Sequence, residues 1–89
     1  MMRRVAADVF PPGEFIWDEL DERGWTPTDL AYRLGRPLES MNEIIADWEA
    51  ITPDTAKGLA NAFGANAEMW MNLEAAYRLS RVEGTAEDS

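Results

Sequence analysis

The sequence predicts an all-α domain of five short helices, two of which form a helix-turn-helix. Three observations support this fold class. Apolar residues recur at spacings of three and four along most of the 89-residue chain, as they do on one face of a helix. Cap and stop residues divide this pattern into short segments. The sequence shows no alternation of apolar and polar residues of the kind that indicates strands.

The organisation is that of one domain between two terminal segments. We expect an N-terminal arm over residues 1–12, because Pro11-Pro12 disfavours a helix before Gly13. The helix-turn-helix domain then covers residues 13–81. From residue 82 the chain is acidic and rich in small residues, so we expect a disordered acidic tail over 82–89. The expected helices are 13–23, 28–34, 38–48, 53–63 and 66–79.

The second and fourth helices carry the clearest start signals. Thr26 and Thr52 are good N-cap residues, and each is followed by a proline at the first helical position. An aspartate in the first turn of each helix stabilises the positive end of the helix dipole. Gly35 and Gly64 follow these helices and are typical stop residues.

The helix-turn-helix prediction rests on the spacing of Ala31 and Gly35. Two helices cross closely only where the contact residue is small, and Ala31 meets that need. The turn needs a residue that tolerates left-handed backbone, and Gly35 meets that need. Met41, Ile44 and Ile45 then give the third helix its buried side.

Composition excludes several classes of function. The chain contains neither cysteine nor histidine, which excludes disulfides, thiolate metal sites and the commonest general base. We therefore expect no enzyme, no cofactor and no metal site. The acids within residues 18–22 lack the loop geometry that calcium needs and are interpreted as a solvated face. No apolar run approaches the roughly 18–20 residues that span a bilayer, so we expect a cytoplasmic protein with no membrane partner.

Five segments resemble the HigA-type antitoxins, which belong to the lambda-repressor-like class of helix-turn-helix proteins. The segments are 12–16 (PGEFI), 22–26 (ERGWT), 29–35 (DLAYRLG), 51–56 (ITPDTA) and 69–77 (MWMNLEAAY). The resemblance runs without gaps from Pro12 to Leu79. It implies a five-helix lambda-repressor-like DNA-binding domain and a homodimer that places its third helix in the major groove of an operator. It also implies repression of the chain's own operon and neutralisation of a HigB-like, RNA-cleaving toxin.

The resemblance also implies where the partners bind. The candidate DNA-binding residues lie around the turn and along the third helix: Thr28, Arg33, Arg36, Glu39, Ser40, Asn42 and Glu43. Lys57 is a further candidate contact. The fifth helix is expected to form the dimer interface through Met69, Trp70, Leu73 and Tyr77. The alternative for these apolar residues is the core of the domain.

The third helix departs from the family, whose members carry basic or polar residues there. Glu39, Glu43 and Asp47 stand four apart and would form one acidic ridge that repels phosphate, although Glu39 is able to accept a hydrogen bond from a cytosine amine. Leu38 and Trp48 are expected to extend the core; exposed together, they would mark a partner site. The net charge is −9, from 17 acids and 8 bases. The alternative function is therefore a protein-interaction module on the same fold, with weak or lost DNA binding.

Overall fold

The computed structural model describes residues 10–88, which form five α-helices and no strand. The helices are α2 (Pro12–Arg23), α3 (Pro27–Leu34), α4 (Leu38–Ile45), α5 (Pro53–Phe63) and α6 (Ala67–Asp88). The predicted all-α fold and its five helices are confirmed. The expected arm lies outside the described residues up to residue 9, and so does Ser89.

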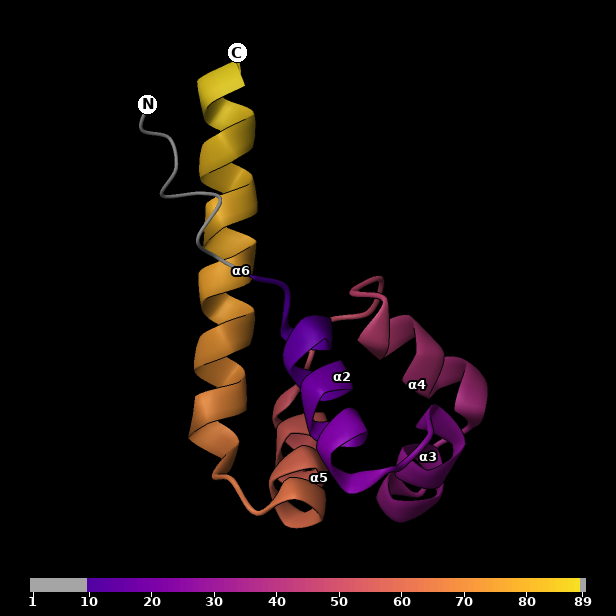
Figure 1. The fold of residues 1–89 in the computed structure, drawn as a ribbon. Coiled ribbons are helices and arrows are strands. Elements are labelled where there is room, and N and C mark those ends of the chain that lie inside the picture. The colour runs from indigo at the N-terminus through magenta and orange to yellow at the C-terminus, as the bar shows by residue number, and fades with distance from the viewer. Residues whose placement is uncertain (1–9, 89) are drawn as a thin grey trace.

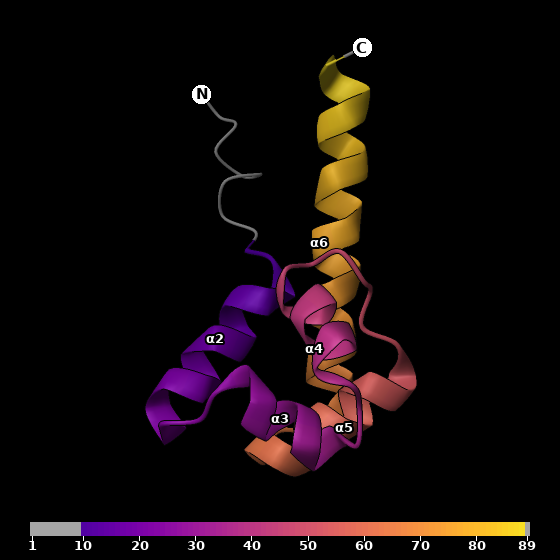
Figure 2. The same cartoon turned by 90° about the vertical axis from the view of Figure 1, so that its right-hand side faces the viewer.

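Helices α2 to α5 form the body of the domain, and α6 stands along one side of it (Figure 1). The first half of α6 packs against α5 and α2, whereas its second half extends beyond the body, as Figure 2 shows from another side. Helix α3 packs against α4 and α5, and α4 packs against α2. None of the helices within residues 10–88 combines the length and the apolar character that crossing a membrane requires.

All five helices contribute to one hydrophobic core. Its buried side chains are Ile16, Leu20, Leu30, Ala31, Met41, Ile44, Ile45, Ile51, Ala56, Leu59, Phe63 and Trp70. Aromatic rings extend this core between α5, α6 and the start of α3. The Phe63 ring lies 5.9 Å from that of Trp25 and 6.0 Å from that of Trp70, measured between ring centroids. These separations lie in the range that aromatic pairs prefer.

The predicted helix starts are confirmed at both threonines. Thr26 Oγ1 accepts a hydrogen bond from the Asp29 backbone N–H at 3.2 Å, and Asp29 Oδ2 accepts one from the Thr26 N–H at 2.9 Å. This reciprocal capping box satisfies two backbone donors at the start of α3. Thr52 Oγ1 accepts from the Thr55 N–H at 3.3 Å at the start of α5. Gly35 has a φ of 68°, so the turn after α3 uses the left-handed backbone that the sequence predicts.

Helix α4 ends at Ile45, three residues before the predicted end at Trp48. Asp47 causes the difference, because it adopts a φ of 66°, which a continuing helix does not allow. Its Oδ1 accepts a hydrogen bond from the Gly13 N–H at 3.1 Å. This bond satisfies one of the backbone donors that the start of α2 leaves without a helical partner. Helix α2 itself begins at Pro12 rather than Gly13, with the proline in the first turn, where its missing N–H costs nothing.

Helix α6 is assigned as far as Asp88, so its last turns cover most of the segment for which the sequence predicts an acidic tail, 82–89. No proline interrupts this segment, and most of its residues are compatible with a helix. Acidic composition indicates poor core formation, but a helix that extends an existing one needs no new nucleus.

Candidate nucleic-acid interface

Helices α3 and α4 form the helix-turn-helix around a three-residue turn at 35–37. Ala31 on α3 is buried, as its small size predicts. Met41, Ile44 and Ile45 are buried on the inner side of α4, which also confirms the prediction. The inner side of α4 is therefore fixed in the core, and its other side is available to solvent.

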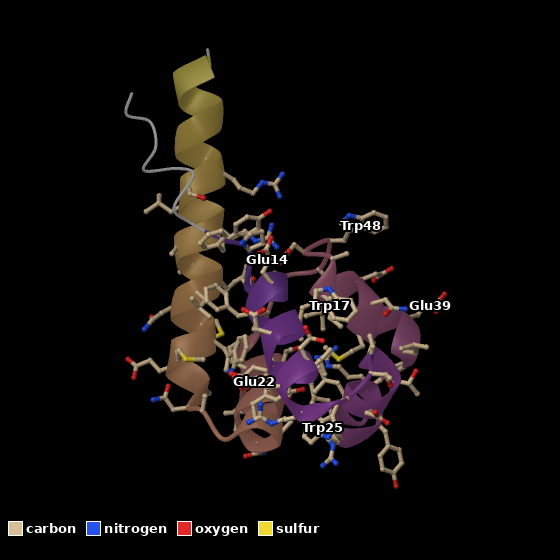
Figure 3. The ribbon with its side chains drawn as sticks, in the orientation of Figure 1. Glu14, Trp17, Glu22, Trp25, Glu39 and Trp48 are labelled. Atoms are coloured by element: carbon tan, nitrogen blue, oxygen red, sulfur yellow. The ribbon has the colours of Figure 1, made fainter. Side chains whose placement is uncertain are left out.

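The outer side of α4 carries Glu39, Asn42 and Glu43, all of them exposed. Figure 3 shows Glu39 on the side of α4 that points away from the body. Thr28, in the first turn of α3, is also exposed. With Arg33, which is exposed as well, five of the candidate DNA-binding residues are thus accessible. Two of these five are acids, which repel a phosphate backbone.

The predicted acidic ridge does not form as expected. Glu39 and Glu43 share the outer side of α4, but Asp47 lies beyond the helix end and is half-buried. Its carboxylate turns toward the start of α2, where it accepts the hydrogen bond from Gly13. The correction follows from the φ of 66° at Asp47, which breaks the four-residue spacing. The ridge therefore contains two acids, and the third has a structural role.

Burial raises the pKa of the Asp47 carboxyl above its ordinary value of 3.8. The hydrogen bond from Gly13 opposes this rise in pKa, because it stabilises the charged form. Among the nearby charges, Glu74 and Glu14 raise the pKa further, and Arg78 lowers it. Asp47 is thus a partly desolvated acid at the junction of α2, α6 and the loop after α4.

Arg36 is held inside the domain rather than extended toward solvent. It donates a hydrogen bond to Thr55 Oγ1 at 2.6 Å and another to Ser40 Oγ at 3.2 Å. Its guanidinium also lies 3.9 Å from a carboxylate oxygen of Glu49 and 3.9 Å from one of Asp54. The Arg36 side chain is only 22% exposed. The structure therefore brings Arg36 and Ser40 together but gives both of them partners within the chain.

The two other candidate cations differ in their surroundings. The Arg33 guanidinium lies 3.9 Å from the centroid of the Trp25 ring, within the range of a cation–π contact. Arg33 remains exposed, and so does Lys57 on α5. These two residues are the accessible positive charges among the candidates. Asp29, Glu39, Glu43 and Asp54 are exposed acids on the same three helices, so the region as a whole is acidic.

Leu38 and Trp48 do not extend the core, contrary to the expectation from the sequence. Leu38 is 42% exposed and Trp48 is 83% exposed. Trp17 on α2 is 49% exposed. The hydrogen bond from Gly13 to Asp47 joins the start of α2 to the loop that carries Trp48. Trp17 follows Gly13 by one helical turn, so both tryptophans flank the junction of α2 and α4, as Figure 3 shows.

Acidic side chains line the solvent-facing side of α2. Glu14, Asp18, Asp21 and Glu22 are exposed, and Figure 3 shows Glu14 and Glu22 at its two ends. Glu19 forms an ion pair with Arg23, whose guanidinium also donates to the Phe63 carbonyl oxygen at 2.7 Å. Within residues 10–88, no group of three or more acidic side chains is arranged to hold a metal ion.

The four candidate dimer residues on α6 have different environments. Trp70 is completely buried, so it belongs to the core and offers no surface to a partner. Trp70 is buried because its ring packs against that of Phe63, where α6 meets α5. Met69 is 38% exposed, and Leu73 and Tyr77 are half-buried. These three residues retain surface that a second chain can cover.

Three residues that hold the site together are missed by the sequence reasoning. Glu49 and Thr55 bind Arg36 from the loop and from α5. Glu74 is buried on α6, where Oε1 accepts from the Ile51 N–H at 3.2 Å and Oε2 accepts from Arg78. The only sequence signal is an acid or a hydroxyl at an otherwise apolar or capping position. Such a signal does not identify a partner that is 19 or 23 positions away.

Comparisons with known proteins agree with this geometry. No protein-family model matches the chain. The chain is 37% identical to the Virulence-associated protein I of Dichelobacter nodosus, over 81% of this chain and 68% of the relative. A HigA-family addiction module antidote protein from Coxiella burnetii is 31% identical, with a TM-score of 0.83 over 90% of this chain and 88% of the other. The Pseudomonas aeruginosa antitoxin HigA, solved with the higBA promoter, gives the same identity, TM-score and coverage.

Proposed function

Because the chain belongs to the HigA family of helix-turn-helix antitoxins, we propose that it is the antitoxin of a toxin–antitoxin pair and has no enzymatic role. It binds operator DNA as a homodimer, represses its own operon and neutralises a HigB-like toxin. The similar Pseudomonas aeruginosa protein was solved with promoter DNA, which supports the DNA-binding part. The net charge of −9 favours a basic toxin, because opposite charges speed encounter.

One observation carries the proposal for DNA. The inner side of α4 is packed into the core, whereas Glu39, Asn42 and Glu43 on its outer side are exposed. The major groove of B-DNA is wide enough to admit an α-helix. A short helix held rigidly by one side is able to present its other side to the base edges there.

Asn42 provides the most direct test of this docking. Its amide is able to form two hydrogen bonds with adenine in the major groove. We expect Asn42→Ala to weaken binding to the DNA upstream of the chain's own gene by about 5- to 100-fold. Asn61→Ala, an equally exposed asparagine on α5, is the matched control. Fluorescence anisotropy at low salt measures both; absence of sequence preference at micromolar protein would contradict the proposal.

The homodimer is proposed to form along α6, where Met69, Leu73 and Tyr77 retain exposed surface. Met69→Glu places a charge in this interface and should shift the protein toward monomer. Glu68→Gln, on the neighbouring exposed position, serves as the control. Light scattering gives the mass of each protein. If Met69→Glu keeps the mass of a dimer, the interface does not include Met69. A monomeric wild type would contradict the proposed dimer.

The second candidate function, a protein-interaction module, is favoured by the exposed Trp17 and Trp48 beside the acidic side of α2. Exposed tryptophans are enriched among the residues that dominate binding energy in interfaces. If this function holds, Trp48→Ala should abolish co-purification with a small basic toxin that is co-expressed from the same operon. Tyr32→Ala, which removes an equally exposed aromatic ring from α3, is the control. Co-purification that survives Trp48→Ala would contradict this second candidate.

A further inference from the structure

Glu49 reaches both of the polar groups that the turn offers to a phosphate. Its Oε1 accepts a hydrogen bond from Ser40 Oγ at 3.4 Å, and its Oε2 lies 3.9 Å from Arg36 Nη1. Ser40 Oγ also accepts from Arg36 Nη1, which closes a triangle of three side chains. Arg36 and Ser40 are the candidate DNA contacts at the start of α4, and one carboxylate occupies both.

The position of Glu49 is fixed by the backbone of its loop. The N–H groups of Trp48 and Glu49 both donate to the Glu43 carbonyl oxygen, at 2.8 and 3.1 Å. These bonds fold the loop back against α4. The Glu49 side chain is 39% exposed, whereas that of Asp54, the other acid near Arg36, is 94% exposed. Water screens Asp54 more strongly, so Glu49 is the acid with the greater influence on Arg36.

We propose that Glu49 is an internal competitor for DNA phosphate: it occupies Arg36 and Ser40 in the free protein and thereby lowers the affinity of the helix-turn-helix for DNA. This inference rests on the DNA docking proposed above. A carboxylate and a phosphate both accept from a guanidinium in the same geometry. A phosphate that approaches Arg36 must displace the Glu49 carboxylate or remain beside it, where the like charges repel.

The test is Glu49→Gln, which keeps the size of the side chain and an acceptor for Ser40 but removes the charge. The probe is a 20-base-pair duplex of arbitrary sequence, because phosphate contacts do not depend on base sequence. We expect Glu49→Gln to tighten binding by about three- to tenfold at low salt. The slope of log K against log salt should become steeper by about one per protomer. Glu22→Gln, the same charge change at an exposed site on α2, should alter affinity by less than about 1.5-fold.

The Arg36→Gln background separates competition from a general charge effect. Without the guanidinium, Glu49→Gln has no cation to release, so its gain should disappear in the double variant. Thermal unfolding checks that all the variants are folded. A gain no larger than that of Glu22→Gln, including no detectable binding by any of the proteins, overturns the proposal. A full gain in the Arg36→Gln background also overturns it.

The same titrations distinguish this inference from the proposed function. Equal affinity for the arbitrary duplex and for the DNA upstream of the chain's own gene contradicts operator recognition. The gain from Glu49→Gln remains measurable on either duplex. Conversely, sequence-preferring binding with no gain from Glu49→Gln retains the operator function and removes the role of Glu49.

Discussion

Helices α3 and α4 have the same length, eight residues each, but they are fixed in different ways. Helix α3 begins with a capping box and is capped after Leu34 by Gly35, so residues within or beside it satisfy its ends. Helix α4 begins after Pro37 without a side-chain cap. The loop that follows it is fixed by Asp47, which binds Gly13 on another helix. The first helix of the motif is thus defined locally, and the second depends on tertiary contacts.

The largest effect is expected at Gly13, where α2 meets the end of α4. A methyl group on Gly13 would overlap the carbonyl oxygen of Ile45, and backbone cannot move aside as a flexible side chain can. We expect Gly13→Ala to lower the free energy of unfolding by about 3 kcal/mol. Urea unfolding followed by circular dichroism measures the loss.

Gly58 on α5, which faces Leu34 at the end of α3, provides the corresponding control. A methyl group there would lie 2.8 Å from Leu34 Cγ, so the Leu34 side chain would have to shift, but no backbone atom would. Gly58→Ala also gains helix propensity, so its net effect should stay within about 1 kcal/mol. Equal stability of Gly13→Ala and the wild type would show that α4 does not depend on this contact.

The second effect concerns the local cap of α3. Thr26→Ala removes the acceptor for the Asp29 N–H and should lower the free energy of unfolding by about 1 kcal/mol. Thr28→Ala makes the same chemical change at an exposed position two residues later and should change it by less than about 0.5 kcal/mol. Equal losses in the two variants would mean that the capping box contributes nothing beyond the residue type.

The third effect is a pH dependence at Asp47, smaller than the loss of the cap. Its pKa is raised in the folded protein, so the folded state binds the proton more tightly than the unfolded state does. The free energy of unfolding should therefore fall as pH rises from about 3.8 through the raised pKa. Asp47→Asn keeps an acceptor for the Gly13 N–H but has no carboxyl to titrate, so its free energy of unfolding should not show this fall.

The measurement for Asp47 is the difference in free energy of unfolding between Asp47→Asn and the wild type, from pH 3 to pH 7. This difference should increase with pH in favour of the variant. Asp18→Asn on the exposed side of α2 removes one negative charge without the junction and is the control. A difference that stays constant with pH, or matches that of Asp18→Asn, would refute the role of burial.

The smallest change in the free energy of unfolding is expected on replacing the two most exposed aromatic residues of this region, Tyr32 on α3 and Trp48 after α4. Trp48 is 83% exposed and Tyr32 on α3 is 85% exposed. Replacing either by alanine should change the free energy of unfolding by less than about 0.5 kcal/mol, because little surface leaves the core. A larger loss at Trp48 than at Tyr32, measured by urea unfolding, would show that the loop after α4 depends on the indole ring.

The same contrast explains which features the sequence predicts. The start of α3 at Thr26, the turn at Gly35 and the buried Met41 and Ile44 follow from short-range signals, and all are confirmed. The end of α4 is predicted incorrectly, because it depends on a bond between Gly13 and Asp47, 34 positions apart. The helical spacing of residues in the sequence continues past Ile45, so it gives no sign that α4 ends there.

The candidate site divides in a similar way. Exposure of Glu39 and Asn42 follows from helical periodicity once the inner side of α4 is known. The partners of Arg36 do not follow from helical periodicity, since Thr55 lies 19 positions away and Glu49 is in a loop. Hydrogen bonds between remote side chains leave no periodic trace in the sequence. Whether a cation is accessible was therefore the least predictable property of the site.

The buried carboxylate of Glu74 ties α6 to the body of the domain. It joins the first half of this helix to the Ile51 N–H, two residues before α5, and to Arg78 one turn further along α6. Beyond this point α6 extends away from the body of the domain (Figure 1). The position of the segment beyond Arg78 is therefore set through the part of α6 that Glu74 anchors.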